Sequence, residues 1–238
     1  IPNSIHLAKD DPSFVLLTGP NMAGKSTIMR QVALIVIMAQ MGSFVPATEA
    51  RLSIVDQILT RIGASDFLVK GQSTFMVEMI ETARILHHAT ENSLIVLDEI
   101  GRGTSTYDGL SIAEAVSTHI IKEIGARCFF ATHYHELSTL AETHDCVQSF
   151  HMGVKESNNN IHFTYQLSPG SADKSYGVHV ADMAGVPKSV IQYAQRRLAE
   201  LESDTSDDDT PQMPTTVKSK APCPGPKKAV ELEQLPLF

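Results

Sequence analysis

Nine consecutive residues near the amino end have the spacing of a phosphate-binding loop: Gly19-Pro20-Asn21-Met22-Ala23-Gly24-Lys25-Ser26-Thr27. They match the pattern G-x-x-x-x-G-K-[S/T] at every fixed position. Glycines let the backbone wrap around a polyphosphate, so that successive N–H groups and a helix amino end point at its oxygens. The Lys25 ammonium would contact the β- and γ-phosphates, and the Ser26 hydroxyl would bind Mg²⁺. The loop therefore predicts binding of a nucleoside triphosphate with Mg²⁺.

An acidic pair, Asp98 and Glu99, follows the apolar run 94–97. At the carboxyl end of a strand, Asp98 is suited to hold, directly or through water, the Mg²⁺ that Ser26 binds. Glu99 is then the candidate to polarise the attacking water. The alternative is that the pair simply ends a strand and caps the next segment of the chain. The matching phosphate loop favours the catalytic interpretation, and ATP hydrolysis is the predicted reaction.

His133 follows another apolar run, 128–131, one residue after Thr132. From a strand end, an imidazole could sense the γ-phosphate, although a lone histidine there is ordinarily a hydrogen-bonded structural residue. His133 and His135 could also form a metal pair, but no third ligand stands at a convincing spacing.

These side chains need a scaffold of alternating strands and helices. Apolar runs at 14–18, 94–97 and 128–131 predict strands, and helices are expected from about residue 25, over 74–89 and over 110–124. This alternation is typical of an α/β fold with a parallel sheet. The helix after the loop is apolar almost all round, which predicts burial on every side. In the helix over 74–89 the expected buried face contains Met76, Met79, Ala83 and Leu86.

Composition limits the other possibilities. A chain of 238 residues that is 42% apolar can bury one main core. Its net charge of −8 argues against a surface that is a nucleic-acid clamp throughout. Three cysteines at irregular spacings indicate a reduced, cytoplasmic setting, and no apolar run approaches the length of a membrane span. The chain begins without a methionine, so we expect a part of a longer protein.

Four near-literal segments then carry a resemblance: the loop itself, 71–79, 97–109 and 131–137. In this order they resemble the ATPase domain of the MutS family of bacterial DNA mismatch-repair proteins, over about residues 1–202. The resemblance implies a P-loop NTPase of the ABC-ATPase class, with a mainly parallel sheet flanked by helices. It also implies Mg²⁺-dependent ATP hydrolysis that is coupled to mismatched-DNA binding by domains upstream of this chain.

In that class two subunits enclose two nucleotides. The resemblance therefore implies that Ser73 contacts, in trans, the γ-phosphate held by the partner's loop. It assigns catalytic roles to Glu99, Lys25 and His133 in the same chain, and Mg²⁺ binding to Ser26 and Asp98. The loop 101–106 would lie beside the catalytic carboxylate at the dimer interface.

The expected organisation has four parts. Residues 1–170 form the ATPase domain, 171–202 a helix-turn-helix dimerisation element, 203–230 a disordered linker, and 231–238 a sliding-clamp-binding peptide. The helix-turn-helix could instead read DNA, but its second helix carries few basic residues, Lys188, Arg196 and Arg197. The last five residues, Gln234-Leu235-Pro236-Leu237-Phe238, are similar to the peptide with which bacterial replication and repair proteins dock on the sliding clamp. A chance apolar end is the alternative.

The implied partners are a second copy of the chain, mismatched double-stranded DNA through the upstream domains, the sliding clamp and a MutL-type repair protein, at a nucleoid-associated location. Two rivals stay open. Another ABC-class ATPase, of a transporter or of chromosome maintenance, would carry an LSGGQ-like signature, and Gln72-Ser73-Thr74-Phe75-Met76 argues against it. A non-catalytic dimerisation and clamp-tethering module would not need Glu99.

Overall fold

A computed structural model describes residues 1–7, 13–63, 73–157, 160–172 and 176–204. Its centre is a six-stranded sheet in the order β2-β3-β4-β1-β5-β6. The strands are β1 (Phe14–Thr18), β2 (Ile58–Arg61), β3 (Leu94–Asp98), β4 (Arg127–Ala131), β5 (Val147–Ser157) and β6 (Asn160–Pro169). Neighbours from β2 through β5 pair in parallel, and only β5 and β6 are antiparallel. The predicted α/β fold with a mainly parallel sheet is confirmed.

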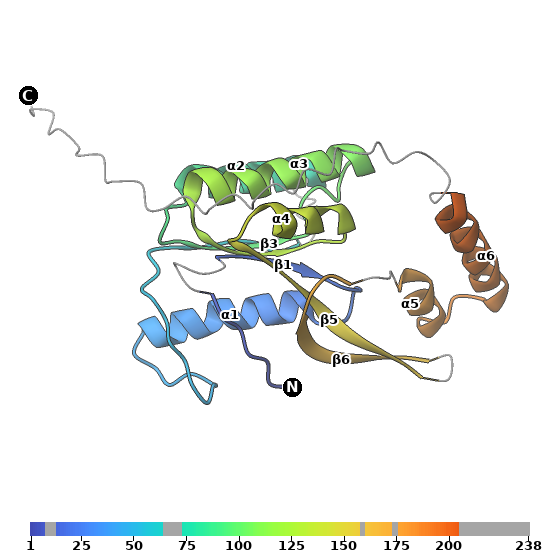
Figure 1. Ribbon diagram of the computed structural model, residues 1–238, viewed down its shortest axis with the longest axis horizontal. Coiled ribbons are helices and arrows are strands. Elements are labelled where there is room, and N and C mark those ends of the chain that lie inside the picture. The colour runs from blue at the N-terminus through green and yellow to red at the C-terminus, as the bar shows by residue number, and fades with distance from the viewer. Residues whose placement is uncertain (8–12, 64–72, 158–159, 173–175, 205–238) are drawn as a thin grey trace, which may run out of the picture.

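Helices cover both faces of this sheet (Figure 1). One face carries α1 (Lys25–Gln40). The other carries α2 (Thr74–His88), α3 (Thr106–His119) and α4 (Thr139–Thr143). A π-helical turn, η2 (Ile120–Ile124), continues α3, and a 3₁₀ turn, η3 (His135–Ser138), precedes α4.

Two hydrophobic clusters fill the spaces between the layers. Strand β1 shows the alternation, because Phe14 and Leu16 belong to one cluster, and Val15 and Leu17 to the other. The first cluster takes its helical side chains from α2, α3 and α4, and the second from α1. A strand that is buried on both faces reads as an uninterrupted apolar run, which explains why β1 could be predicted from its sequence.

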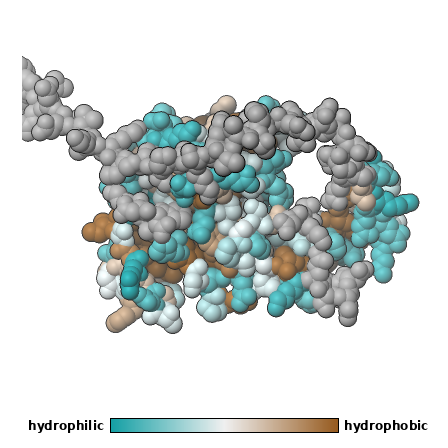
Figure 2. All heavy atoms as spheres, viewed as in Figure 1, coloured by the Kyte–Doolittle hydropathy of each residue, from teal (hydrophilic) through white to brown (hydrophobic). Residues whose placement is uncertain are grey.

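One expectation about buried helix faces is wrong and a second is right only in part. Helix α1 packs on the sheet along one side only, and leaves Leu34 57% and Ile37 42% exposed. Figure 2 shows hydrophobic side chains at the surface over the carboxyl end of this helix. In α2 Met79 and Leu86 pack against the first cluster as expected, but Met76 is 53% exposed and Ala83 is exposed. The fully buried residues of this helix are instead Glu78, Thr82 and Ile85. The buried face of α2 is thus partly polar, because Glu78 has a charged partner in the interior.

The helical pair after the sheet consists of α5 (Gly177–Met183) and α6 (Lys188–Asp204), which lie beyond the sheet in Figure 1. Ile191 of α6 is buried, while several large apolar side chains of the pair are exposed: Met183, Val190, Tyr193 and Leu201. The predicted linker and clamp peptide beyond residue 204 lie outside the described residues. Among the described helices, none has the length and hydropathy of a membrane span.

Candidate nucleotide-binding site

The predicted phosphate loop joins β1 to α1 at the carboxyl end of the parallel strands. Its backbone takes positive φ angles at Gly19 (121°), Met22 (70°) and Gly24 (102°). A Cβ atom on Gly19 would lie 3.2 Å from the backbone N of Met152, so the loop passes close to β5. Gly24 stands at the N-cap of α1 with no side-chain cap. The first N–H groups of this helix, which lack partners within a helix, are therefore suited to bind an anion.

Lys25 lies over this loop and is only 5% exposed. Its Nζ donates hydrogen bonds to the Gly19 carbonyl oxygen at 2.6 Å and to Asn21 Oδ1 at 3.3 Å. Burial lowers the pKa of Lys25, and the carboxylates of Glu99 and Asp98 partly oppose that shift. The ammonium is thus held against the loop by two neutral oxygens. A phosphate would attract it more strongly, so Lys25 could turn toward a bound nucleotide.

Ser26 and Asp98 meet although 72 residues separate them. The Ser26 hydroxyl donates to Asp98 Oδ2 at 2.6 Å, joining the first turn of α1 to the carboxyl end of β3. Mg²⁺ binds proteins through one or two oxygen ligands while keeping waters and substrate phosphates. A hydroxyl and a carboxylate beside a phosphate-binding loop fit Mg²⁺ with a polyphosphate. No cluster of three or more His, Cys, Asp or Glu residues suited to an all-protein metal cage occurs among the described residues.

Glu99 has a backbone that residues with a side chain seldom adopt. Its φ is 56°, in the left-handed region, while its N–H donates to the Ala131 carbonyl oxygen at 2.9 Å. Its carboxylate contacts Nη1 of Arg102. Such a conformation costs about 1 kcal/mol or more and is concentrated at functional sites. The chain turns sharply at this residue as it leaves β3.

His133 follows β4, the strand between β1 and β3, and is therefore at the same edge of the sheet. Burial lowers the pKa of His133, an effect that Glu99 opposes and that Arg102 and Lys25 reinforce. Its ring packs against that of Tyr134 with a tilt of 37° and 4.1 Å between the centroids. The structure thus brings Lys25, Glu99 and His133 within electrostatic reach of one another, and their catalytic roles stay predictions.

Ser73 lies elsewhere. It is the N-cap of α2, with its side chain exposed and in no capping hydrogen bond. Helix α2 covers the face of the sheet opposite to α1 (Figure 1), and no described contact joins Ser73 to the loop of its own chain. Its predicted role in another subunit's site is neither supported nor opposed by a contact, and residues 71–72 lie outside the described part.

Two residues near the site were missed by the sequence reasoning. Tyr165 of β6 has a φ of 56°, and its Cδ1 would lie 3.4 Å from a Cβ atom on Gly24. A half-exposed ring there could stack on a nucleotide base. Only the pairing of β6 with β5, and of β5 with β1, brings it to the loop, so no local pattern could have indicated it. Glu78 of α2 is the second, a buried carboxylate that accepts the Gly101 N–H just after Glu99.

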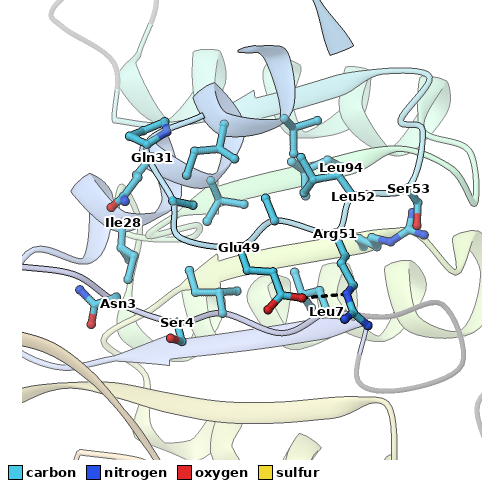
Figure 3. A pocket seen from close by; sticks show the side chains of 18 of the residues that line it. Asn3, Ser4, Leu7, Ile28, Gln31, Glu49, Arg51, Leu52, Ser53 and Leu94 are labelled. Atoms are coloured by element: carbon cyan, nitrogen blue, oxygen red, sulfur yellow. Dashed lines mark hydrogen bonds and ion pairs between the residues drawn. The ribbon is translucent and has the colours of Figure 1, made fainter. Parts of the chain in front are cut away.

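A cavity of about 590 Å³ lies between the amino-terminal segment, α1 and residues 46–55 (Figure 3). Its lining includes Asn3, Ile28, Gln31 and the exposed pair Glu49 and Arg51, which form a 2.9 Å ion pair. None of residues 19–27 lines it. The cavity is therefore separate from the predicted phosphate site.

Comparisons with known proteins agree with the arrangement. The family model described as MutS domain V matches residues 15–202. A DNA mismatch repair protein MutS of Syntrophomonas wolfei is 56% identical over 204 residues, which are 86% of this chain and 24% of that protein. Proteins of the same name from Halothermothrix orenii and Thermodesulfovibrio yellowstonii are each 58% identical over 85% of this chain, which covers 23% and 24% of their lengths. The chain thus spans about a quarter of these relatives.

Proposed function

This chain belongs to the MutS family, whose domain V it matches, and we propose that it binds Mg²⁺ and ATP at residues 19–27 and hydrolyses the ATP. In this proposal it is a P-loop NTPase of the ABC-ATPase class that provides the nucleotide switch of a mismatch-repair dimer. The observation that carries the proposal is the 2.6 Å contact between Ser26 and Asp98 beside the buried Lys25.

Each group has a distinct task in the proposed hydrolysis. The loop N–H groups and Lys25 bind the phosphates and stabilise the charge that develops on them. Bound Mg²⁺, held by Ser26 and Asp98, would neutralise phosphate charge. Glu99 orients and polarises the attacking water, and His133, neutral because burial lowers its pKa, senses the γ-phosphate. Tyr165 offers its ring to the base.

An Asp98→Asn variant tests the metal-dependent part. Asparagine keeps the size of the side chain but removes the charge, so Mg²⁺-dependent turnover should fall about 100-fold, in line with the several kcal/mol that a metal ion contributes. Turnover is measured by phosphate release with and without Mg²⁺. Asp182→Asn, on the exposed side of α5, is the matched control. Unchanged Mg²⁺ dependence in Asp98→Asn would remove Asp98 from the site.

The assembly is also part of the proposal. The exposed apolar side chains of α5 and α6 (Met183, Val190, Tyr193 and Leu201) support a homodimer through the helix-turn-helix element together with the ATPase domain. The names of the relatives support mismatched DNA as the ultimate ligand, through domains upstream of this chain. A MutL-type protein is a further proposed partner.

The sliding-clamp proposal rests on the sequence of the last five residues, 234–238, alone. Deleting them should abolish capture of the chain by an immobilised sliding clamp and leave ATP turnover unchanged. Replacing Leu237 and Phe238 by alanine should have the same effect, because these two side chains would fill the apolar pocket. Capture that survives both changes would contradict the docking role.

A further inference from the structure

The backbone of Gly101, two residues after Glu99, is held on both sides of its Cα by side chains of different elements. Its N–H donates to Glu78 Oε1 of α2 at 2.5 Å. The Gly101 carbonyl oxygen accepts a hydrogen bond from Tyr134 Oη at 3.1 Å, on the segment that follows β4. Glu78, Gly101 and Tyr134 are all buried, so water does not compete for either bond.

Close packing at three glycines also restrains this loop. Gly101 has a φ of 89°, and a Cβ atom there would lie 2.5 Å from the carbonyl oxygen of Gly109. A Cβ on Gly109 would lie 2.2 Å from Tyr134 Oη, and one on Gly103 would lie 2.9 Å from Cβ of Phe75 in α2. The loop after Glu99 therefore packs directly on the first two turns of α2 and on the start of α3 at its glycines.

The carboxylate of Glu78 forms a buried ion pair with Arg61. Arg61 of β2, itself buried, places Nη2 3.3 Å from Glu78 Oε2 and Nε 3.1 Å from Glu81 Oε2. A buried carboxylate is costly unless it is paired and hydrogen-bonded. Here one oxygen faces Arg61 and the other accepts the Gly101 N–H, so the bond to the loop is charge-assisted and stronger than a neutral one.

These contacts fix the backbone on both sides of Glu99. Its own N–H is bound to Ala131 of β4, and the peptide two residues later is bound to Glu78 and Tyr134. The short stretch between these anchors has to turn through the left-handed conformation of Glu99. The direction in which the Glu99 side chain leaves the backbone therefore depends on Glu78 and Tyr134, while its carboxylate contacts Arg102.

We propose that Glu78 and Tyr134 are positioning residues that orient Glu99 for attack by water on the bound nucleotide. The inference rests on the proposed ATPase function. Catalytic groups lose much of their effect when they are misplaced by about 1 Å, so loss of either bond should lower kcat. KM for ATP should not change, because Lys25 and Ser26 keep their places.

Two variants of the full chain test this. Tyr134→Phe removes only the hydroxyl group. Glu78→Asp keeps the charge for Arg61 but withdraws the carboxylate from Gly101 by one methylene. Each should lower kcat about fivefold to tenfold, the effect of one hydrogen bond. The matched controls are Thr143→Val, which removes only an exposed hydroxyl group of α4, and Glu81→Asp, the other carboxylate on Arg61. Unchanged kcat in both test variants would overturn the proposal.

A second comparison separates positioning from general damage. In a Glu99→Gln background, Tyr134→Phe should cause no further loss of kcat, because there is no catalytic carboxylate left to orient. If the same fivefold to tenfold loss appeared in this background, the hydroxyl would act independently of Glu99, and the proposal would be wrong.

Amide hydrogen exchange provides a readout that does not depend on turnover. Exchange at Gly101, followed by mass spectrometry, should be faster in Tyr134→Phe and Glu78→Asp and unchanged in the two controls. Unchanged exchange in the test variants overturns the inference whatever the turnover. Faster exchange in a chain without Mg²⁺-dependent turnover would refute the proposed function and, with it, the orienting role, while the hold on Gly101 would stand.

Discussion

Glu99 combines a rare backbone conformation with a largely buried side chain, which an acidic residue that only ends a strand would not need. Its backbone is in the left-handed region, its side chain is only 16% exposed, and its carboxylate contacts Arg102. A chain under no functional constraint would place glycine or asparagine at such a φ. A strained backbone that places a carboxylate near Lys25 and His133 supports the proposed catalytic role of Glu99.

Replacing Glu99 by glutamine tests its role as the base. The amide keeps the shape of the side chain but cannot polarise water in the same way, so hydrolysis should slow about 100-fold or more. Binding of ATP, measured by equilibrium dialysis, should be unaffected because the loop is intact. Glu114→Gln, on the exposed face of α3, serves as the control. Full turnover in Glu99→Gln would assign the base to another residue.

The pH dependence of kcat tests His133. Because burial lowers its pKa, the neutral imidazole should persist below the ordinary value of about 6.5, and activity should decline only at still lower pH. Between the lowered pKa and about 6.5 the unfolded chain binds more protons, so stability falls as pH falls through this window. When turnover is measured from about pH 5 to pH 8, the decline of kcat at low pH should be absent in His133→Asn. If kcat still declines at low pH in this variant, the decline is caused by the titration of another residue.

At the scale of elements, the loop 99–105 and α3 depend on two facing glycines. Gly109→Ala would place a methyl group 2.3 Å from the Gly101 carbonyl oxygen, and backbone cannot yield as a side-chain end can. We expect a loss of about 1–3 kcal/mol in the free energy of unfolding, as overpacking usually causes.

Gly177→Ala is the matched control for this change, because it also lies in a helix but has open space around it. Alanine there should be neutral or slightly stabilising, since it favours the helical conformation. Denaturant unfolding followed by circular dichroism compares the two. Equal stability of Gly109→Ala and the wild-type chain would mean that the loop is free to move away.

Sequence alone predicted the elements whose signals are local. Strands β1, β3 and β4 are buried on both faces, so each is an apolar run, and α1 starts at the lysine of a recognisable loop. The pattern of α2 predicted the packing of Met79 and Leu86, but it could not predict the burial of Glu78, which enters the interior only with Arg61, 17 residues away. Likewise, Leu34 and Ile37 indicate burial by their type but lie on the open side of α1.

At the scale of the whole molecule, the residues of the proposed site form two groups that do not meet within the described chain. The loop, Asp98, Glu99 and His133 gather at one edge of the sheet, whereas Ser73 begins a helix on the opposite face from α1. The same helix contacts the loop after Glu99 through Phe75 and Glu78. A ligand of another subunit that touched Ser73 would therefore act on an element that supports Glu99.

Mixing two inactive variants tests whether sites are shared between subunits. A Lys25→Ala subunit paired with a Ser73→Ala subunit has one composite site that lacks both groups and one that is intact. Random assortment makes half of the dimers mixed, so turnover should recover to about a quarter of the wild-type value.

The control for this experiment pairs Lys25→Ala with the double variant Lys25→Ala, Ser73→Ala. No dimer in that mixture has a lysine in either loop, so no activity should return. Phosphate release is measured after the subunits have exchanged, at a protein concentration where sedimentation shows dimers. If the first mixture is as inactive as each variant alone, Ser73 must act within its own chain or outside the reaction. If activity returns in the first mixture and not in the control, each loop must be completed by the amino end of α2 of the partner subunit.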